Sequence, residues 1–204
     1  KIKRVNIVGN KIYSDEELLK NFKFKPRTWR SFFSKREPYS KENLKGDLEN
    51  LESFYKNRGF LKFNVDSSSV SLSEDKKNIF ITVNISENDL FFNNEVSYAG
   101  DLPDAIDPLS IIQITQFIVP NNVFSQETLT YAEDQITSLM SNQGFSSAEV
   151  IASTEEAEKE NFVDITIFID PGQRTYVRKI NFSGNKRTHD VVLRREMRQM
   201  EGSW

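Results

Sequence analysis

The chain of 204 residues contains no cysteine and a single histidine, and both facts restrict its chemistry. Without cysteine there can be no disulfide framework, no thiolate nucleophile and no cysteine-based zinc site. The one histidine, His189, lies near the C-terminal end, which removes Ser-His pairs and histidine-bound metals from most of the chain. We therefore expect no enzymatic activity, no catalytic residues, no metal site and no bound cofactor.

The composition also limits the partners. Glycines stand singly, so there is no glycine-rich phosphate loop. Lys and Arg number 27 against 30 Asp and Glu, which argues against nucleic acid because its binders usually carry a basic excess. No apolar run approaches the ~20 residues of a membrane span. Because the chain opens on a strand and stops inside an element, we expect it to be a segment of a longer protein, with any signal peptide or anchor outside it.

Three short alternating strands end in Gly followed by Asn or Asp. They occupy residues 5–10, 96–101 and 180–185, and their glycines are 91 and 84 residues apart. That spacing is the size of a domain and too long for a solenoid repeat. A second motif keeps the same register, since Tyr55-Lys56-Asn57-Arg58-Gly59-Phe60 corresponds to Met140-Ser141-Asn142-Gln143-Gly144-Phe145. The sequence therefore predicts units at residues 1–88 and 89–172, and a truncated third unit at 173–204.

Helix signals follow the first strand. Ser14 and Glu17 have the spacing of a capping box, which predicts a helix start. A second helix is expected from Ser40 onward, with an apolar stripe formed by Leu44, Leu48, Leu51 and Tyr55. Gly59 is expected to end this helix in a left-handed conformation.

Two extended stretches, 61–72 and 79–85, predict a hairpin that closes the first unit. The second stretch keeps its apolar residues at odd positions, the pattern of a strand buried on one face. In the first stretch Phe63 and Val65 are odd-numbered, whereas Val70 and Leu72 are even-numbered. One extra residue must lie between these pairs if all four face the core, and we expect this β-bulge at Ser67–Ser69.

The second unit repeats the plan. Asp107-Pro108 predicts the start of a helix that carries Leu109, Ile112 and Ile114, and Ser125 starts another that ends near Gly144. In the third unit, residues 190–201 predict an amphipathic helix. The element order is β-α-α-β-β, so the predicted fold class is α+β: tandem domains, each with a three-stranded mixed sheet covered on one face by two helices.

The bulged strand is the candidate binding site. An edge strand leaves backbone N–H and C=O groups unpaired, and an extended peptide can add to it. The candidate residues are Phe63, Val65, Ser67, Ser68, Ser69, Val70, Ser71 and Leu72. Each added main-chain bond contributes only about 0.5–1.5 kcal/mol net, so binding would be weak and tolerant of sequence. The alternative, which stays open here, is that the bulge only protects an edge from aggregation.

A stretch at 26–36 mixes Trp29, Phe32 and Phe33 with basic residues. Our first interpretation is local packing of the aromatic rings, the second a docking surface for a protein, and the third contact with lipid or nucleic acid. A function of a different class is a small α+β RNA-binding module. KH-type domains, however, need a Gly-x-x-Gly loop that this sequence lacks, and a basic stacking face would also be expected.

The tandem β-α-α-β-β plan resembles POTRA domains, the periplasmic modules of the Omp85 family. Motifs similar to that family are residues 6–10, 46–49, 70–72, 75–77, 176–180 and 192–202. Together they extend over the whole chain, and the last two are long and specific. The chain resembles the third, fourth and beginning fifth POTRA domains of the members that assemble outer-membrane β-barrels, and the nearest alternative is another Omp85-type transporter.

This resemblance implies a non-enzymatic scaffold at the periplasmic face of the bacterial outer membrane, without nucleotide or cofactor. It implies two classes of partner: accessory lipoproteins, one of which docks on the first unit, and unfolded outer-membrane protein precursors that add a strand to the edge at 63–72. A lipoprotein contact at the fifth domain falls on Arg194 and Glu201. The membrane itself would be reached only through a C-terminal barrel that is absent from this segment.

Overall fold

The computed structural model describes residues 2–22, 40–198 and 200–203, so the aromatic and basic stretch at 26–36 lies outside the described residues. The described chain is α+β and contains two three-stranded sheets, with strand orders β1-β3-β2 and β4-β6-β5. It divides into two compact bodies, one with residues 1–94, 120–128 and 156–163 and the other with residues 95–119, 129–155 and 164–204. The terms first unit and second unit are kept for residues 1–88 and 89–172. The predicted fold class is confirmed.

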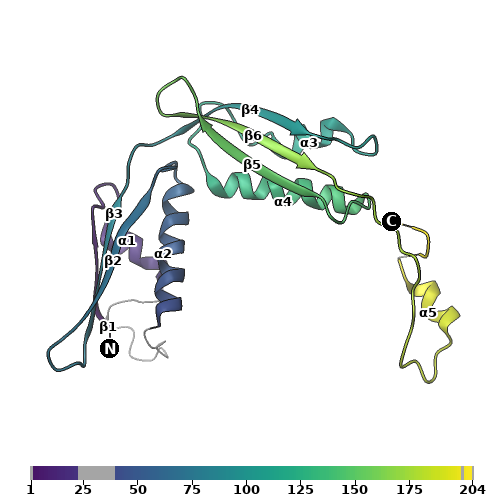
Figure 1. Cartoon of the computed structure of the whole chain (residues 1–204), viewed down its shortest axis with the longest axis horizontal. Coiled ribbons are helices and arrows are strands. Elements are labelled where there is room, and N and C mark those ends of the chain that lie inside the picture. The colour runs from purple at the N-terminus through teal and green to yellow at the C-terminus, as the bar shows by residue number, and fades with distance from the viewer. Residues whose placement is uncertain (1, 23–39, 199, 204) are drawn as a thin grey trace. The chain divides into compact units, whose positions relative to one another are not determined.

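The first sheet is mixed. Its central strand β3 (Ile79–Ser86) pairs in parallel with β1 (Ile2–Val8) and antiparallel with β2 (Asn64–Leu72). Helices α1 (Asp15–Leu18), which continues into the 3-10 turn η1 (Leu19–Asn21), and α2 (Lys41–Lys56) lie on one face of this sheet (Figure 1). The arrangement leaves β2 as an edge strand.

The helix boundaries follow the predicted capping signals. The Ser14 hydroxyl accepts the N–H of Glu17 at 3.3 Å, and the Ser40 hydroxyl accepts the N–H of Asn43 at 3.1 Å. Gly59 has a φ of +94°, as a left-handed helix end requires. Local hydrogen-bonding chemistry therefore determines where these helices begin and end.

Aromatic stacking and aliphatic packing build the core of the first unit between sheet and helices. Tyr55 of α2 stacks on Phe63, with 4.2 Å between ring centroids. The buried residues around them include Val5, Ile7, Leu18, Leu44, Leu51, Phe60, Ile81, Val83 and Ile85. Leu48 of the predicted stripe is only partly buried against this core. Phe63 is therefore a core residue, although it directly precedes the edge strand.

The predicted bulge is present but lies one residue earlier than expected. Val65 pairs with Ile85, and Ser67 pairs with Asn84, so the extra residue is Asp66. Two hydrogen bonds hold the extra residue, because the Asp66 carboxylate accepts from Asn64 Nδ2 at 2.9 Å and from Ser86 Oγ of β3 at 2.7 Å. Beyond the bulge, the serines pair regularly with β3.

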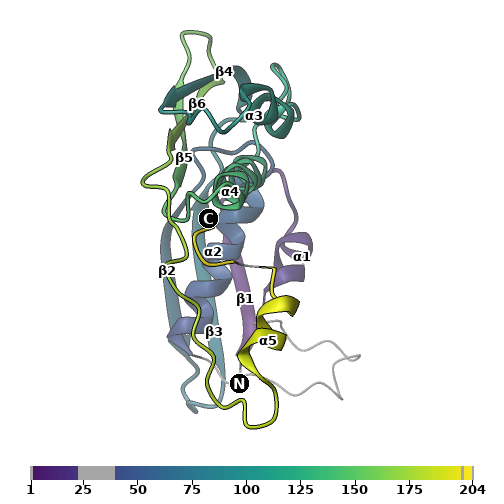
Figure 2. The ribbon, with the colours of Figure 1, turned by 90° about the vertical axis from the view of Figure 1, so that its right-hand side faces the viewer.

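The second sheet is formed by β4 (Phe92–Gly100), β6 (Phe162–Asp170) and β5 (Glu149–Glu156). Helices α3 (Pro108–Thr115) and α4 (Gln126–Asn142) lie on the same face of it (Figure 2). Asp107 caps α3 by accepting the N–H of Leu109 at 3.0 Å, as predicted. Ser125 accepts the N–H of Thr128 at 3.4 Å at the start of α4.

The repeated glycines end the first strand of each unit for a steric reason. Gly9 has a φ of +106°, and a Cβ atom there would lie 2.0 Å from the carbonyl oxygen of Ile85. At Gly100 the φ is +96°, and a Cβ atom would lie 2.1 Å from the carbonyl oxygen of Ile169. Only glycine fits both the backbone conformation and the space.

The C-terminal segment differs from its prediction. Helix α5 spans Asp190–Glu196 and not 190–201, and its C-cap Met197 already has an extended backbone. The chain then turns back, since Gly202 and Ser203 exchange backbone hydrogen bonds with Val177 at 2.8 Å. Residues 171–189 contain no strand, so the third Gly-Asn motif does not form the strand expected before it. Among the described residues, no further strand lies beside this segment to pair with it.

Candidate functional site

The candidate edge strand β2 is exposed along most of its length. All side chains from Asp66 to Leu72 are exposed, and Val65 is partly buried. Val70 pairs with Ile81 and Leu72 pairs with Ile79, so both lie on the same face as the buried residues of β3. They are nevertheless 40% and 58% exposed, which leaves an apolar strip beside an open edge.

Polar contacts hold the bulged end of this edge in place. Asn84 Nδ2 donates to Ser67 Oγ at 2.7 Å, and Ser86 Oγ donates to Asp66 Oδ2 at 2.7 Å. Both donors come from the central strand β3. The bulge is therefore a fixed feature of the edge, and Ser67 already has a partner within the sheet. Ser68, Ser69 and Ser71 complete the row of small polar residues along β2.

The turn between β2 and β3 closes the other end of the edge. The carboxylate of Asp75 accepts hydrogen bonds from the hydroxyl of Ser73 and from the N–H of Lys77, the latter at 3.1 Å. These bonds, above all the one from Ser73, lower the pKa of Asp75 below its ordinary value. The hairpin tip is thus ordered by its own side chains.

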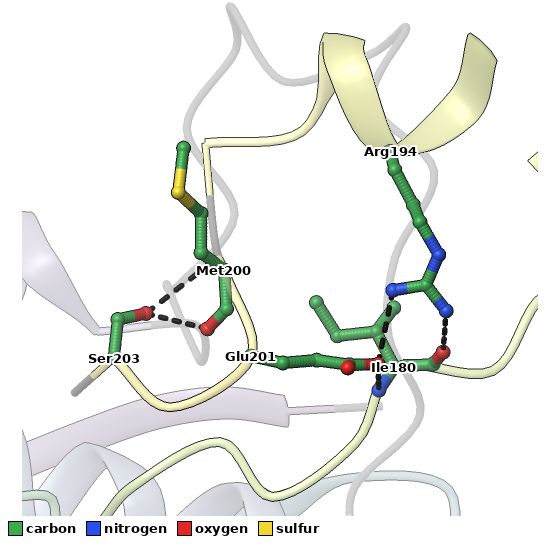
Figure 3. Close-up of polar contacts among 5 residues, drawn as sticks. All are labelled: Ile180, Arg194, Met200, Glu201 and Ser203. Atoms are coloured by element: carbon green, nitrogen blue, oxygen red, sulfur yellow. Dashed lines mark hydrogen bonds and ion pairs between the residues drawn. The ribbon is translucent and has the colours of Figure 1, made fainter. Parts of the chain in front are cut away.

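The second pair of predicted site residues, Arg194 and Glu201, forms one surface cluster (Figure 3). Arg194 Nη1 lies 2.9 Å from Glu201 Oε1, and Arg194 Nη2 donates to the carbonyl oxygen of Ile180 at 2.8 Å. The N–H of Ile180 donates to Glu201 Oε1 at 2.9 Å. The two charged side chains therefore bind the backbone N–H and C=O groups of Ile180. Nothing in the sequence indicated that Ile180 belongs to this cluster.

The acid of this cluster is kept ionised by its neighbours. The hydrogen bond from the Ile180 N–H lowers the pKa of Glu201 below its ordinary value, and the Arg194 guanidinium adds to the effect. Both charged side chains stay partly open to solvent, each about 40% exposed. The cluster can therefore offer a fixed negative and a fixed positive group to a partner, next to a cavity lined in part by Val191, Met197 and Met200.

Within the described part of the chain, no three potential ligands gather into a metal site. Every helix in this described part of the chain is too short or too polar to cross a bilayer.

The model of the POTRA family, described as a surface antigen variable number repeat, matches residues 1–88, 94–172 and 175–204. Over its whole length the chain is 32% identical to the outer membrane protein assembly factor BamA of Buchnera aphidicola and covers 33% of that protein. It is 26% identical to the protein of the same name from Neisseria meningitidis and covers 25% of it. The chain thus spans between a quarter and a third of the length of these relatives.

Two solved structures share the fold. The crystal structure of Haemophilus influenzae BamA POTRA3-5 superimposes with a TM-score of 0.80 at 24% identity, covering all of this chain and 79% of the other. The structure of BamA from Haemophilus ducreyi lacking POTRA domains 1-3 gives a TM-score of 0.60 at 15% identity, over 87% of this chain and 29% of the other. At these identities the likeness concerns the fold alone.

Proposed function

Since this chain belongs to the POTRA family, we propose that it is a periplasmic scaffold segment of the machinery that assembles β-barrel proteins into the bacterial outer membrane. The relatives named outer membrane protein assembly factor support this role. Its partners would be accessory lipoproteins and unfolded barrel precursors. It would act at the periplasmic face of the outer membrane, without a catalytic step.

The observation that carries the proposal is the exposed edge of β2. Strand addition needs unpaired backbone groups, side-chain contacts on at least one face, and no obstructing neighbour. The stretch from Asp66 to Leu72 supplies an exposed edge, with small serines on it and the apolar side chains of Val70 and Leu72 near its end. Barrel precursors consist of strands with alternating apolar side chains, so their chemistry matches this edge.

Crosslinking in cells tests this edge. A photo-crosslinker is scanned along residues 61–72 in the complete protein, with Thr82 of the central strand β3 as the control position. We expect Val70 to capture extended barrel-strand segments far better than Thr82, because β3 has neighbours on both sides. Equal yields at the two positions would contradict strand addition at β2.

A peptide pair tests the role of the backbone. A barrel-strand peptide should compete with crosslinking at Val70, whereas the same peptide with a central proline should compete poorly, because proline lacks an N–H and breaks the ladder. If both peptides compete equally, side-chain contacts alone account for the binding.

For the lipoprotein contact, the cluster of Arg194 and Glu201 is the proposed surface. Glu201→Lys should weaken co-purification of one lipoprotein, but this change also breaks the internal ion pair. The swapped variant Arg194→Glu/Glu201→Lys restores an ion pair of reversed polarity but not the two hydrogen bonds to the Ile180 backbone, so circular dichroism must first show that its fold is unchanged. We expect the swap to remain defective if the lipoprotein contacts these charges directly. Full recovery in the swap would assign the pair a purely internal role.

A further inference from the structure

The second unit has an apolar groove between its edge strand and a helix. The groove has a volume of about 180 Å³. Its walls include Tyr98, Gly100 and Leu102 from the end of β4 and beyond, and Pro108, Ile111 and Ile112 from α3. Figures 1 and 2 both show α3 next to β4. The site is separate from the β2 edge, and its occupancy does not depend on the proposed function of that edge.

Some apolar side chains at this groove do not enter the core and stay exposed to solvent. Helix α3 turns Ile111 and Thr115 inward, and both are buried. Leu109 and Ile112, on the same helix, stay 62% and 52% exposed. The hydroxyls of Tyr98 and Thr115 are hydrogen-bonded, which ties the tyrosine to the helix and fixes one wall of the groove. Such a fixed apolar surface favours a partner that brings apolar side chains.

The backbone of β4 favours an extended partner. β4 is an edge strand of the order β4-β6-β5. Its start is covered, since Asn93 exchanges backbone hydrogen bonds with Asn121 and Asn122 at 2.8 and 2.9 Å. Toward Gly100, within the described residues, β4 has a neighbouring strand on the β6 side alone. A groove between an edge strand and a helix is a known mode of peptide recognition, in which the strand supplies backbone bonds and the groove takes alternate side chains.

The charge around the groove favours a basic partner. Residues 94–172 hold 14 Asp and Glu against a single basic residue, Lys159, a net charge of −13. Residues 1–88 have 18 basic and 12 acidic residues, so the acidity is confined to the second unit. The loop between β4 and α3 carries three exposed carboxylates, those of Asp101, Asp104 and Asp107. The apolar groove therefore opens beside negatively charged side chains, and the single basic residue of residues 94–172, Lys159, is far from the β4–α3 loop in sequence.

We propose that this groove binds an extended polypeptide segment that combines apolar side chains with lysine or arginine. The apolar side chains would enter between Tyr98 and Ile112. The basic side chains would lie against the carboxylates of the β4–α3 loop, where complementary potential speeds association and selects against acidic segments.

Peptide binding to the whole 204-residue chain tests the proposal. The probe is a fluorescent octapeptide in which leucine alternates with lysine, and its partner carries glutamate at every lysine position. We expect anisotropy to show saturable binding of the lysine peptide that weakens as salt is raised, since exposed charges are screened. The glutamate peptide should bind at least ~5-fold more weakly. Equal binding of both peptides would overturn the proposal.

A matched pair of variants tests the groove itself. Ile112→Ser removes an exposed apolar side chain from the groove, and Ile151→Ser removes one of equal exposure, 52%, from β5. We expect Ile112→Ser to weaken binding of the lysine peptide about fivefold or more, and Ile151→Ser to leave it unchanged. Equal effects would place the binding elsewhere. Circular dichroism verifies that both variants fold.

A second pair separates local from overall charge. The triple variant Asp101→Asn/Asp104→Asn/Asp107→Asn keeps the helix cap at position 107, because Asn caps as well as Asp. Its control, Glu149→Gln/Glu155→Gln/Glu158→Gln, changes the net charge by the same amount at exposed positions outside the β4–α3 loop. Binding should fall ~5-fold or more in the first variant only. An equal fall in both variants would show that the peptide is attracted non-specifically by the negative charge, which refutes the proposal. The proposal is also refuted if the chain self-associates and the peptide dissociates these complexes, because the groove would then bind a second copy of the chain.

Discussion

The hydroxyl of Tyr55 donates a hydrogen bond to Glu87 Oε1 at 2.7 Å inside the first unit. Tyr55 is fully buried, and Glu87 is one of the few buried charged residues among those described. The same carboxylate accepts the backbone N–H groups of Lys11 at 2.8 Å and Ile12 at 3.2 Å. Glu87 therefore ties helix α2 and the turn after β1 to the end of β3.

Removal of the Tyr55 hydroxyl should destabilise the chain. Tyr55→Phe keeps the ring and its stacking on Phe63 but deprives a buried carboxylate of one donor. Hydrogen bonds to charged groups contribute about 1.5–3 kcal/mol, and we expect a loss of that size in the free energy of unfolding. Urea denaturation measures it. Tyr131→Phe, at a residue that is 53% exposed, serves as the control and should change stability by less than about 0.5 kcal/mol. Equal effects of the two changes would contradict the role of the buried bond.

The same contact predicts a loss of stability in alkali. Burial, followed by the hydrogen bond to the Glu87 carboxylate, raises the pKa of Tyr55 above its ordinary value of 10.0. The folded chain thus holds the phenol proton more tightly than the unfolded chain does, so the contribution is complete below pH 10 and is lost as the pH rises beyond it. The free energy of unfolding between pH 8 and 11 should fall more steeply for the unmodified chain than for Tyr55→Phe. Parallel curves would show that Tyr55 does not titrate differently in the two states.

Much of the fold could be predicted because its signals are local. Ser14, Ser40 and Asp107 each cap a helix through a hydrogen bond to a residue two or three positions away. The parity slip in β2 likewise indicated a bulge, since one extra residue brings the apolar side chains before and after it to the same face of the strand. Each of these signals needs only a short stretch of sequence to be read.

The errors arose where contacts between distant residues decide the outcome. The extra residue of the bulge is Asp66 and not one of the serines, and Ser86 of the neighbouring strand, 20 residues away, donates to its carboxylate. Glu87 carries no recognisable signal in the sequence, because its partners Tyr55 and Lys11 lie 32 and 76 residues away. At the candidate sites, periodicity did not show that Ile112 stays outside the core, because that depends on how α3 is rotated on its sheet.

The ion pair between Arg194 and Glu201 leads to a prediction about the pKa of Glu201. The pKa of Glu201 is lowered first by the Ile180 N–H and then by Arg194. Arg194→Gln should therefore raise the pKa of Glu201 only part of the way to its ordinary value of 4.5, because the backbone donor remains. NMR titration of the glutamate side-chain carbonyl measures this pKa directly. If the pKa of Glu201 returned completely to 4.5, the guanidinium and not the backbone N–H would be the group that lowers it.

Alanine substitution of two glycines should have opposite effects. At Gly9 the φ of +106° and the carbonyl oxygen of Ile85 leave no room for a Cβ atom, so Gly9→Ala should cost about 3 kcal/mol in the free energy of unfolding. Gly46 lies inside α2, and apart from the backbone of its own helix and its chain neighbours no atom lies within 4 Å of an added Cβ, so Gly46→Ala should stabilise the chain by about 0.5–1 kcal/mol. Urea unfolding of both variants measures the difference. If Gly9→Ala were as stable as the unmodified chain, the glycine that ends the first strand would not be required by its geometry, and the steric account of the repeated motif would be wrong.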